Sequence, residues 1–591
     1  MIKGFLPNSN KEIKKLGWKQ VDVIIVTGDA YIDHPNSQVA VCGKFLDKNG
    51  YNVAVLDMPN IQKNEEWTIF GKPKLFFLVI TGEEDSMVSN YTPYIKLKTS
   101  DQYLPGNKKV NRPDRALIRY CNKIKELYKN SKIVIGGVEA AGRMASHYDF
   151  WSEKVRKPIL FDTKADILLY GNMEFNLVKI AEQLRANGEI KYFNALTGIA
   201  HISNEISERM KYTELPSFED MKDNKDNFLE HERVLHSNQN PYNSETLIQK
   251  VLNRYLIINK PNIPMEPNEI DSIYGSSFTF KPHPKYKEEI PAYERIKDQI
   301  PTHRGTLDAL SFTQDIFTQG RLISFRSKSS ILKNIIFFTK TKIFNKMINN
   351  FYGIRSNYYG ISVRNEEKCR KCELRSCIYP SVCKNLSKGT RAMVEVSKEV
   401  DEVKNVRNNF YASNMDLTLL MSDTDAFKEY IMKGINTYGV LAYFTKNNFL
   451  NNLMGLPEYA KVEEFIESFI KRSGEYSKKY ELKINVLAGY PGEVYEDTVD
   501  NVLEALKLKV TINQIMPFIP LPMTIAACQY YTGKDPFDRG EVTASKKLSE
   551  KKNIVAIYNH NNKSNFKVIH RILHDIGRKK DINKILKMGN K

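Results

Sequence analysis

The residues best suited to chemistry in this chain are four cysteines gathered in one short segment. The stretch CRKCELRSCIYPSVC spaces them as C-x2-C-x4-C-x5-C, and they are Cys369, Cys372, Cys377 and Cys383. Four thiolates this close in sequence can close a tetrahedral zinc (Zn) site or hold an iron–sulfur cluster, and four ligands leave no open position. The alternative is a set of free or partly buried thiols in a reducing cytosol. The pattern favours a structural metal over a catalytic one.

A second set of candidate residues follows predicted strands in the N-terminal third, in the stretches TGDAYIDHP, TGEEDS and GGVEAAGRMASHYDFW. Its members are Asp29, Asp33, His34, Glu139, Arg143 and His147. Because ligands of parallel sheets bind at the carboxyl ends of the strands, Asp29, His34, Glu139 and His147 are predicted to face one crevice. Ordinary capping of strand and helix ends is the competing interpretation. The chain has no G-x-G-x-x-G stretch here, so a dinucleotide site is unsupported.

The elements that would position these side chains alternate between strand and helix. Buried strands are predicted over 21–29, 74–82, 132–139 and 165–172, and in the stretch NVAVLD, with helices over 37–50, 116–131 and 173–188. Near-continuous apolar strands separated by helices indicate a parallel sheet that is covered on both faces. The fold class is therefore α/β.

At 591 residues the chain is too long for one ordinary core. We predict an N-terminal α/β domain over 1–204, followed by a charged connector and Pro-rich linker over 205–295. A second α/β region over 296–545 has the pattern of a whole or partial barrel, with the Cys-rich insertion 369–383 inside it. Its candidate strands are 408–414, 437–445, 483–492 and 513–522. The remainder, 546–591, reads as a basic helical C-terminal module.

The composition is that of a globular protein with a strong positive charge. Apolar residues make up 41% and charged residues 27%, and the formal net charge is +19. Such a charge indicates either a nucleic-acid or anionic-membrane partner, or a general preference for Lys, Asn and Ile throughout the chain. No apolar run is long enough to span a bilayer, and the N-terminus has no apolar signal-peptide core. We expect a cytoplasmic protein with no membrane association.

Several stretches in one order resemble the YgiQ family of uncharacterised radical SAM proteins. They include FLPNS, LGWKQVDVIIVTGDAYIDHP, GGVEAAGRMASHYDFWSEKVRKPIL, HRG, QGR, SCIYPSVCKNL and YPGEVYEDTVD. The resemblance runs over nearly the whole chain. It implies a family-specific N-terminal α/β domain followed by a partial (β/α) barrel of radical SAM type.

In that superfamily a C-x3-C-x2-C loop after the first barrel strand holds a [4Fe–4S] cluster, which cleaves S-adenosylmethionine to a radical. The corresponding stretch here is HRGTLDALSFT, and the three positions are Thr306, Leu310 and Thr313. Iron–sulfur clusters need thiolates, a Thr hydroxyl is a hard neutral ligand, and Leu is no ligand. The radical-generating site has therefore lost every ligand, and binding of S-adenosylmethionine becomes doubtful.

Other positions that the resemblance assigns to the cofactor are kept only in part. The stretch YGIRSN retains Gly353 and Asn357 of a Gly-Gly-Pro-Thr-Ala-Asn motif, and 444–447 has lost an Ala-Pro-Glu-His motif. The turn GYPGEVYED, with Gly489, Pro491 and Gly492, would line the cofactor pocket in an intact relative. It could equally be an ordinary strand-to-helix turn.

Three functions follow as hypotheses. The first is a radical SAM-like protein without its cluster, which is a decayed relative or acts in binding or regulation beside an active paralogue. The second is an active radical SAM enzyme of unknown substrate whose cluster uses cysteines of the segment 369–383. The third is an RNA-associated binding protein, which rests on net charge alone.

Overall fold

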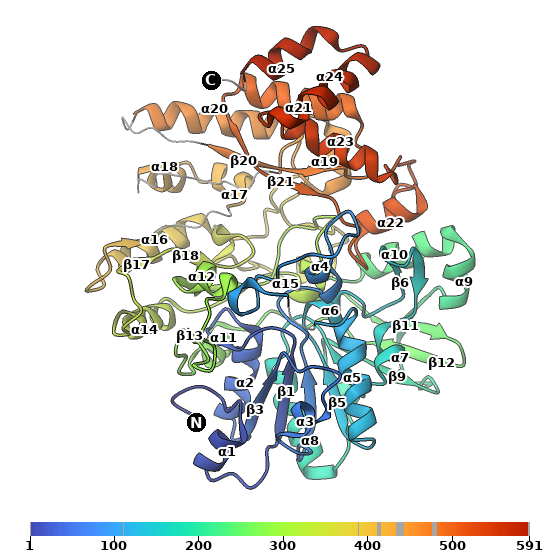
Figure 1. The fold of residues 1–591 in the computed structure, drawn as a ribbon, viewed down its shortest axis with the longest axis vertical. Coiled ribbons are helices and arrows are strands. Elements are labelled where there is room, and N and C mark those ends of the chain that lie inside the picture. The colour runs from blue at the N-terminus through green and yellow to red at the C-terminus, as the bar shows by residue number, and fades with distance from the viewer. Residues whose placement is uncertain are drawn as a thin grey trace.

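The N-terminal half of the chain is organised around a nine-stranded sheet. The computed structural model describes residues 2–109, 112–387, 389–409, 415–432, 443–475 and 482–588. Figure 1 shows this sheet in the blue and cyan part of the ribbon, with helices on both sides. Its spatial order is β10 (Tyr212–Leu215), β11 (Thr246–Val251), β12 (Arg254–Ile258), β9 (Ile199–Ser203), β8 (Ile167–Leu169), β5 (Lys132–Ile135), β4 (Phe76–Val79), β1 (Val23–Thr27) and β3 (Val53–Asp57).

The predicted parallel sheet is confirmed for the strands from β3 to β8, which pair in parallel in the order β3, β1, β4, β5, β8. Alternate side chains of each strand serve opposite faces, so that Val23 and Ile25 lie in one apolar cluster and Ile24 and Val26 in another. The first cluster includes apolar residues of α2 (Gln38–Lys48) and α8 (Glu174–Asn187). The second includes those of α5 (Ala116–Leu127) and α7 (Ile159–Thr163).

The segment expected to be a connector differs in the structure. Its first half adds β10, β11 and β12 to the sheet, with antiparallel pairing of β12 to both β9 and β11. The helices α9 (Phe218–Asp223) and α10 (Lys225–Ser237) cover this end. The expectation missed these strands because β10 lies at the edge of the sheet, where Tyr212 and Glu214 are exposed and the sequence reads as polar.

A second group of parallel strands follows in the C-terminal half. They form parallel pairs: β14 (Gln299–Pro301) with β18 (Asn350–Tyr352), β17 (Met347–Ile348) with β19 (Asn408–Asn409), and β20 (Lys483–Ala488) with β21 (Thr511–Pro517). Tyr443 adds a parallel bridge to Asn485. The strands predicted over 408–414 and 437–445 lie largely outside the described residues. The helices between the strands are α14 (Lys328–Thr339), α16 (Thr390–Asp401), α20 (Tyr459–Glu475) and α21 (Tyr495–Lys507).

The C-terminal helices α23 (Leu548–Tyr558), α24 (Phe566–Asp575) and α25 (Ile582–Met588) lie beside α21 at the top of Figure 1. They share the apolar cluster of the barrel strands, since Ile557 and Ile569 are buried together with Val486. They are therefore part of the barrel's core. The shorter elements are α1 (Asn10–Lys15), β2 (Ile32–Asp33), α3 (Asn64–Thr68), α4 (Ser86–Asn90), η1 (Pro105–Asn107), α6 (Val138–Ala141), β6 (His147–Asp149), β7 (Lys154–Arg156), η2 (Phe193–Ala195), α11 (Pro267–Tyr274), β13 (Lys281–Pro282), α12 (Pro291–Ile296), β15 (His303–Arg304), α13 (Asp315–Thr318), β16 (Ser324–Phe325), η3 (Ser356–Tyr358), α15 (Glu366–Arg370), α17 (Leu417–Met421), α18 (Thr424–Met432), α19 (Asn448–Met454), α22 (Ile525–Thr532), η4 (Lys563–Asn565) and η5 (Lys579–Asp581).

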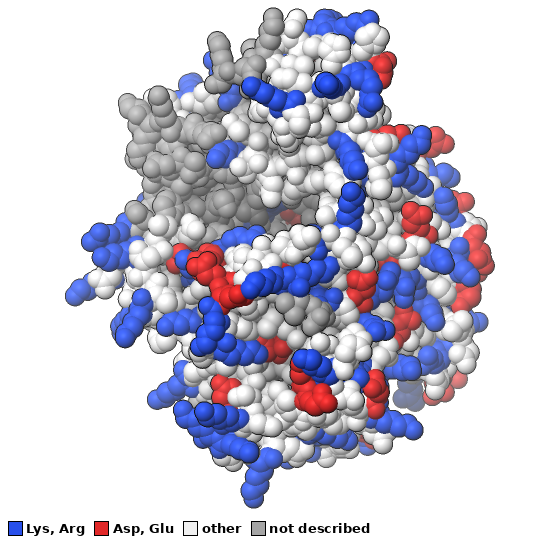
Figure 2. Space-filling view, viewed as in Figure 1, with Lys and Arg blue, Asp and Glu red and all other residues white. Residues whose placement is uncertain are grey.

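The surface charge is mixed on the face drawn in Figure 2, where Lys and Arg side chains are interspersed with Asp and Glu. No described helix is both long and apolar enough to cross a membrane.

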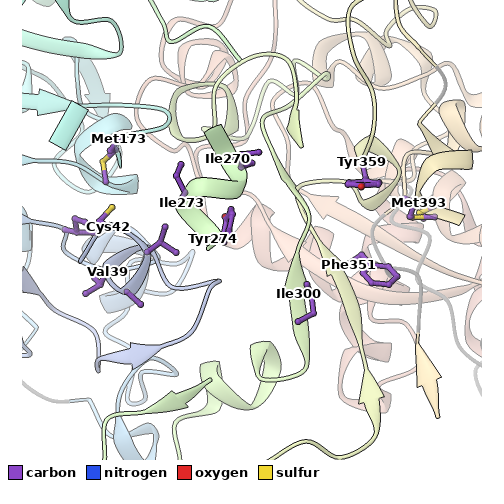
Figure 3. Close-up of a cluster of buried hydrophobic side chains, with 14 of the residues drawn as sticks. Val39, Cys42, Met173, Ile270, Ile273, Tyr274, Ile300, Phe351, Tyr359 and Met393 are labelled. Atoms are coloured by element: carbon purple, nitrogen blue, oxygen red, sulfur yellow. The ribbon is translucent and has the colours of Figure 1, made fainter. Parts of the chain in front are cut away.

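One apolar core runs from the sheet into the barrel by way of α11. In Figure 3, Ile270, Ile273 and Tyr274 of this helix lie between Val39 and Cys42 on the sheet side and Ile300 and Phe351 on the barrel side. The Pro-rich stretch before the barrel is thus ordered against both neighbours, and β13 pairs with β2. This packing holds the carboxyl edge of the sheet next to the first barrel strand.

Candidate functional site

The three loop positions without cysteine meet at one place in the structure. Thr306, Leu310 and Thr313 line a single cavity, together with Asp308 and Arg375. The volume of this cavity is only ≈ 10 Å³, which is roughly enough for one water molecule. Little open space therefore remains between these three side chains.

Asp308 lines this cavity and an adjoining one, where it lies beside Arg355. The hydroxyl of Thr306 donates to Asp308 Oδ1 at 2.7 Å, and that of Tyr358 donates to Oδ2 at 3.1 Å. Arg355 Nε lies 3.6 Å from the same Oδ2, and both partners of this ion pair are buried. Burial, with a smaller effect of Asp308, raises the pKa of neighbouring Asp315 to about 6. Sequence reasoning missed Asp308 and Arg355, because nothing in the local pattern links positions so far apart in the chain.

The retained residues of the cofactor motifs have partners within the protein. The Asn357 side chain accepts from the Asp416 backbone N–H at 2.9 Å and donates to its carbonyl at 2.8 Å. Gly353 lies against the ring of His303. These contacts tie the end of β18 to the segment before α17.

The turn that contains Gly489, Pro491 and Gly492 is closed by a buried carboxylate. Glu493 accepts hydrogen bonds from the Gly489 backbone at 2.6 Å, from the Thr498 hydroxyl at 3.0 Å and from the Tyr558 hydroxyl at 2.7 Å. Burial raises the pKa of Glu493 to about 7. The two glycines have φ values of 78° and 96°, which favour glycine. The turn therefore has a structural role that needs no ligand.

The Cys-rich segment lies directly on the loop of Thr306. The backbone N–H of Cys377 donates to the Leu307 carbonyl at 2.8 Å, and both residues belong to one apolar cluster. On its other side Asn240 donates to the Cys369 carbonyl at 2.8 Å. Asn243 donates to the Cys372 carbonyl at 2.9 Å. The segment therefore bridges the N-terminal half and the barrel mouth, and no long loop is needed to bring it there.

Hydrogen-bond donors point at three of the four sulfurs. Asn385 donates from its side chain to Cys369 Sγ at 3.3 Å and from its backbone to Cys383 Sγ at 3.4 Å. Arg321 donates to Cys377 Sγ at 3.8 Å. Burial raises the pKa of Cys369, and the thiols of Cys372, Cys377 and Cys383 raise it further, so the four are neighbours. Among the described residues, however, no three His, Cys, Asp or Glu side chains are arranged to hold a metal ion as they stand.

The six N-terminal residues fall into three groups: Asp29, the neighbours Asp33 and His34, and three residues around α6. Asp29 pairs with buried Arg112 at 2.7 Å and lines a cavity beside Glu83. Asp33 pairs with Lys44 at 3.5 Å. The His34 ring packs edge-on against Phe280.

The third set lies around α6. Glu139 accepts from the Thr81 hydroxyl at 2.9 Å and from the Leu117 backbone at 3.2 Å. Arg143 forms a buried ion pair with Asp85, and burial lowers the pKa of His147 to about 3. Each of the six side chains thus has a partner within the protein, although Asp33 Oδ1, His34 Nε2 and His147 Nε2 are buried without a hydrogen-bond partner. Asp29 alone of the six lines one of the cavities described here.

A larger cavity lies between the two halves of the molecule. It measures ≈ 260 Å³ and is lined by residues after β4, β5 and β8 on one side and by His303, Arg304 and Gly353 on the other. Arg304 reaches across and donates to Glu174 at 2.6 Å. The sequence indicated the strand ends but gave no sign that Arg304 and Glu174 would meet.

We expect Gly353→Ala to lower the free energy of unfolding by about 1–3 kcal/mol, the usual cost of overpacking. A Cβ at this position would lie 2.1 Å from Cε1 and Nε2 of His303, so the ring would have to move. Urea unfolding followed by circular dichroism measures the change. Gly474→Ala is the control, because nothing lies within 4 Å of its Cβ position in α20, and alanine favours a helix. A loss of stability in the control as large as in Gly353→Ala would contradict the steric explanation.

Comparisons with known proteins give one consistent result. The family description "Radical SAM N-terminal" matches residues 5–299. A UPF0313 protein of Methanocella arvoryzae is 32% identical over 568 residues, which cover 96% of this chain and 95% of that protein. A UPF0313 protein of Clostridium botulinum is 34% identical, and the alignment covers 93% of this chain and 86% of that protein. A UPF0313 protein of Geobacter sulfurreducens is 33% identical, and the alignment covers 90% of this chain and 88% of that protein.

A solved structure with partial likeness is the radical S-adenosylmethionine methyltransferase TsrM from Kitasatospora setae, with tryptophan substrate and a SAM analogue bound. It aligns with a TM-score of 0.45 and 12% identity, over 84% of this chain and 73% of that chain.

Proposed function

This chain belongs to the UPF0313 family, the YgiQ family of radical SAM-related proteins, and we propose that it works without the radical-generating [4Fe–4S] cluster, as a binding protein built on the family's scaffold. The observation that carries the proposal is the mouth of the barrel. Two hydroxyls and an alkyl group stand where a cluster needs three thiolates, and the cavity between them has room for about one water. The residues present do not fit the cluster.

The network around Asp308 supports the same conclusion. A buried ion pair with Arg355 and two hydroxyl donors use the acceptor positions of Asp308. To admit a cluster, the protein would have to expose and rearrange these partners, and unpaired buried charges are costly. The mouth is therefore better suited to holding the loop in place than to receiving a cofactor.

The test is a search for radical chemistry. We expect the protein, purified anaerobically and reconstituted with iron and sulfide, to form no 5′-deoxyadenosine from S-adenosylmethionine under dithionite, because no iron with an open position is held at the mouth. Liquid chromatography with mass detection measures the product against a sample without protein. Turnover in the wild-type chain that disappears in Cys372→Ala would overturn the proposal, and would favour a cluster on the Cys-rich segment instead.

A closed metal site on Cys369, Cys372, Cys377 and Cys383 is the second part of the proposal, with zinc as the metal. The donors from Asn385 and Arg321 support it, because N–H groups aimed at sulfur favour the thiolate form that binds metals. The clamped backbone at Cys369 and Cys372 supports it too, since a C-x2-C turn supplies two adjacent ligands. Metal binding would draw the four sulfurs together from their present spacing. With four ligands this site would stabilise the segment and would leave no position for a substrate.

A further inference from the structure

We propose that the cavity between the N-terminal sheet and the first barrel strand binds a small organic amine in its protonated, ammonium form. We call it the interdomain cavity, and its lining includes Glu83, Glu174, Tyr274, His303, Arg304 and Asp315. This inference goes beyond the loss of radical chemistry and does not depend on it.

The position is one where α/β proteins bind ligands. Glu83 follows β4, Val138 follows β5 and Asn172 follows β8, so the cavity lies at the carboxyl edge of parallel strands. Its volume of ≈ 260 Å³ is far larger than that at the barrel mouth and has room for a small molecule. A neighbouring cavity of ≈ 190 Å³ shares Glu83 and Tyr352 with it.

The charges that face the cavity are mostly negative. The carboxyls are those of Glu83, Glu174 and Asp315, and the one lining cation among Lys and Arg is Arg304. Arg304 forms an ion pair with Glu174 at a distance of 2.6 Å. Among the described residues, neither Glu83 nor Asp315 lies within ion-pair distance of a lysine or arginine.

Glu83 is solvent-exposed and lines both cavities. The protein atoms packed around its carboxyl and the nearby charge of Asp29 raise its pKa to about 7. The backbone N–H of Gln38 donates to Glu83 Oε1 at 2.9 Å. A ligand that brought positive charge would stabilise the ionised form of this carboxyl.

Two buried atoms at the cavity lack hydrogen-bond partners, and one of them is a carboxylate oxygen. Glu174 and His303 are each 2% exposed, and Glu174 Oε2 and His303 Nε2 have no partner. Burial lowers the pKa of His303 to about 4, so the ring is neutral at physiological pH. His303 Nδ1 lies 2.9 Å from the Thr302 hydroxyl, which in turn donates to the Tyr352 carbonyl. A backbone hydrogen bond with Arg355 also involves the ring.

A ligand with an ammonium group matches these features of the cavity. It carries three donors and one positive charge, whereas the cavity offers carboxylate acceptors beside the imidazole of His303. Tyr274 and Tyr352 supply aromatic surface for the organic part of the ligand. A metal ion fits less well, because the described residues hold no group of three ligating side chains.

Titration calorimetry tests this on the full chain with ethanolamine, putrescine and spermidine as probes. We expect at least one amine to bind, and the uncharged 1,4-butanediol and the anion glutarate not to bind. Glu83→Gln should weaken binding at least tenfold, because it removes a negative charge and keeps the shape. Glu288→Gln is the matched control, since its carboxylate pairs with Lys108 on the surface and outside the cavity, and its affinity should match the wild type.

Circular dichroism confirms that each variant is folded, and His303→Gln supplies a second variant that should lower affinity without changing cavity charge. The proposal is overturned if none of the three amines binds at 10 mM, on the order of a weak fragment affinity. It is also overturned if butanediol or glutarate binds as well as the amines, if Mg²⁺ or Zn²⁺ displaces them at this cavity, or if Glu83→Gln leaves affinity unchanged.

Discussion

Arg112→Ala is expected to lower the free energy of unfolding by about 3–5 kcal/mol, as for removal of one member of a buried ion pair. The guanidinium is fully buried and pairs with Asp29 at 2.7 Å and with Asp101 at 3.0 Å. It also donates to the Thr81 carbonyl at 3.2 Å. Its loss would leave two buried carboxyls and one carbonyl without their partner. Urea unfolding at pH 7 measures the change.

The pH dependence of this loss has a definite sign. Burial already raises the pKa of Asp29, and Arg112 is the strongest influence that lowers it. Without the arginine this pKa would rise further, so the variant would lose stability as pH increases and would be closest to the wild type in acid. Lys108→Ala is the control, because its pair with Glu288 is exposed and such pairs contribute about 1 kcal/mol or less. Equal losses in the two variants would contradict the assigned importance of burial.

The parallel part of the first sheet could be predicted because its strands are buried on both faces. The stretches around Ile24, Ala54 and Leu78 are apolar throughout, and the helices between them have clear periodicity. The strands β10 to β12 were missed for a different reason. β10 is an edge strand with Tyr212 and Glu214 exposed, and the mostly buried β11 and β12 follow a long charged stretch.

The candidate site could likewise be predicted only where it depends on residues close together in the sequence. The absence of thiolates at Thr306, Leu310 and Thr313 can be read directly from residue type, and so can the Cys-x2-Cys turn. The ion pair of Asp308 with Arg355 cannot be read from residue type, because the two residues meet only after two barrel strands are placed side by side. The interdomain cavity depends on Arg304 reaching Glu174 across the boundary between the halves. No periodicity in either segment encodes that contact.

Purified wild-type protein is expected to contain about one equivalent of zinc per chain, and Cys369→Ser/Cys372→Ser to contain almost none, because the variant lacks half of the ligands. We expect this metal to contribute to the stability of the segment. Leu374 is 58% exposed, and Cys377, Ile378 and Leu386 supply most of its buried apolar surface. Four thiolates closed on one ion would contribute stability that packing alone does not supply.

Elemental analysis by plasma mass spectrometry gives the metal content, and limited trypsin digestion reports the local fold. Lys368, Arg370 and Lys371 offer cleavage sites in or beside the Cys-x2-Cys turn. We expect cleavage there to accelerate at least tenfold after chelation or in the double Cys variant, while cleavage in the N-terminal sheet stays unchanged. Lys371→Ser, an exposed non-ligand within the same turn, should keep its zinc. Metal content below about half an equivalent, or full retention in the double variant, would show that the four cysteines do not form this site. Iron with stoichiometric sulfide in place of zinc would identify the segment as a cluster site, and would make an iron–sulfur function the leading explanation for this chain.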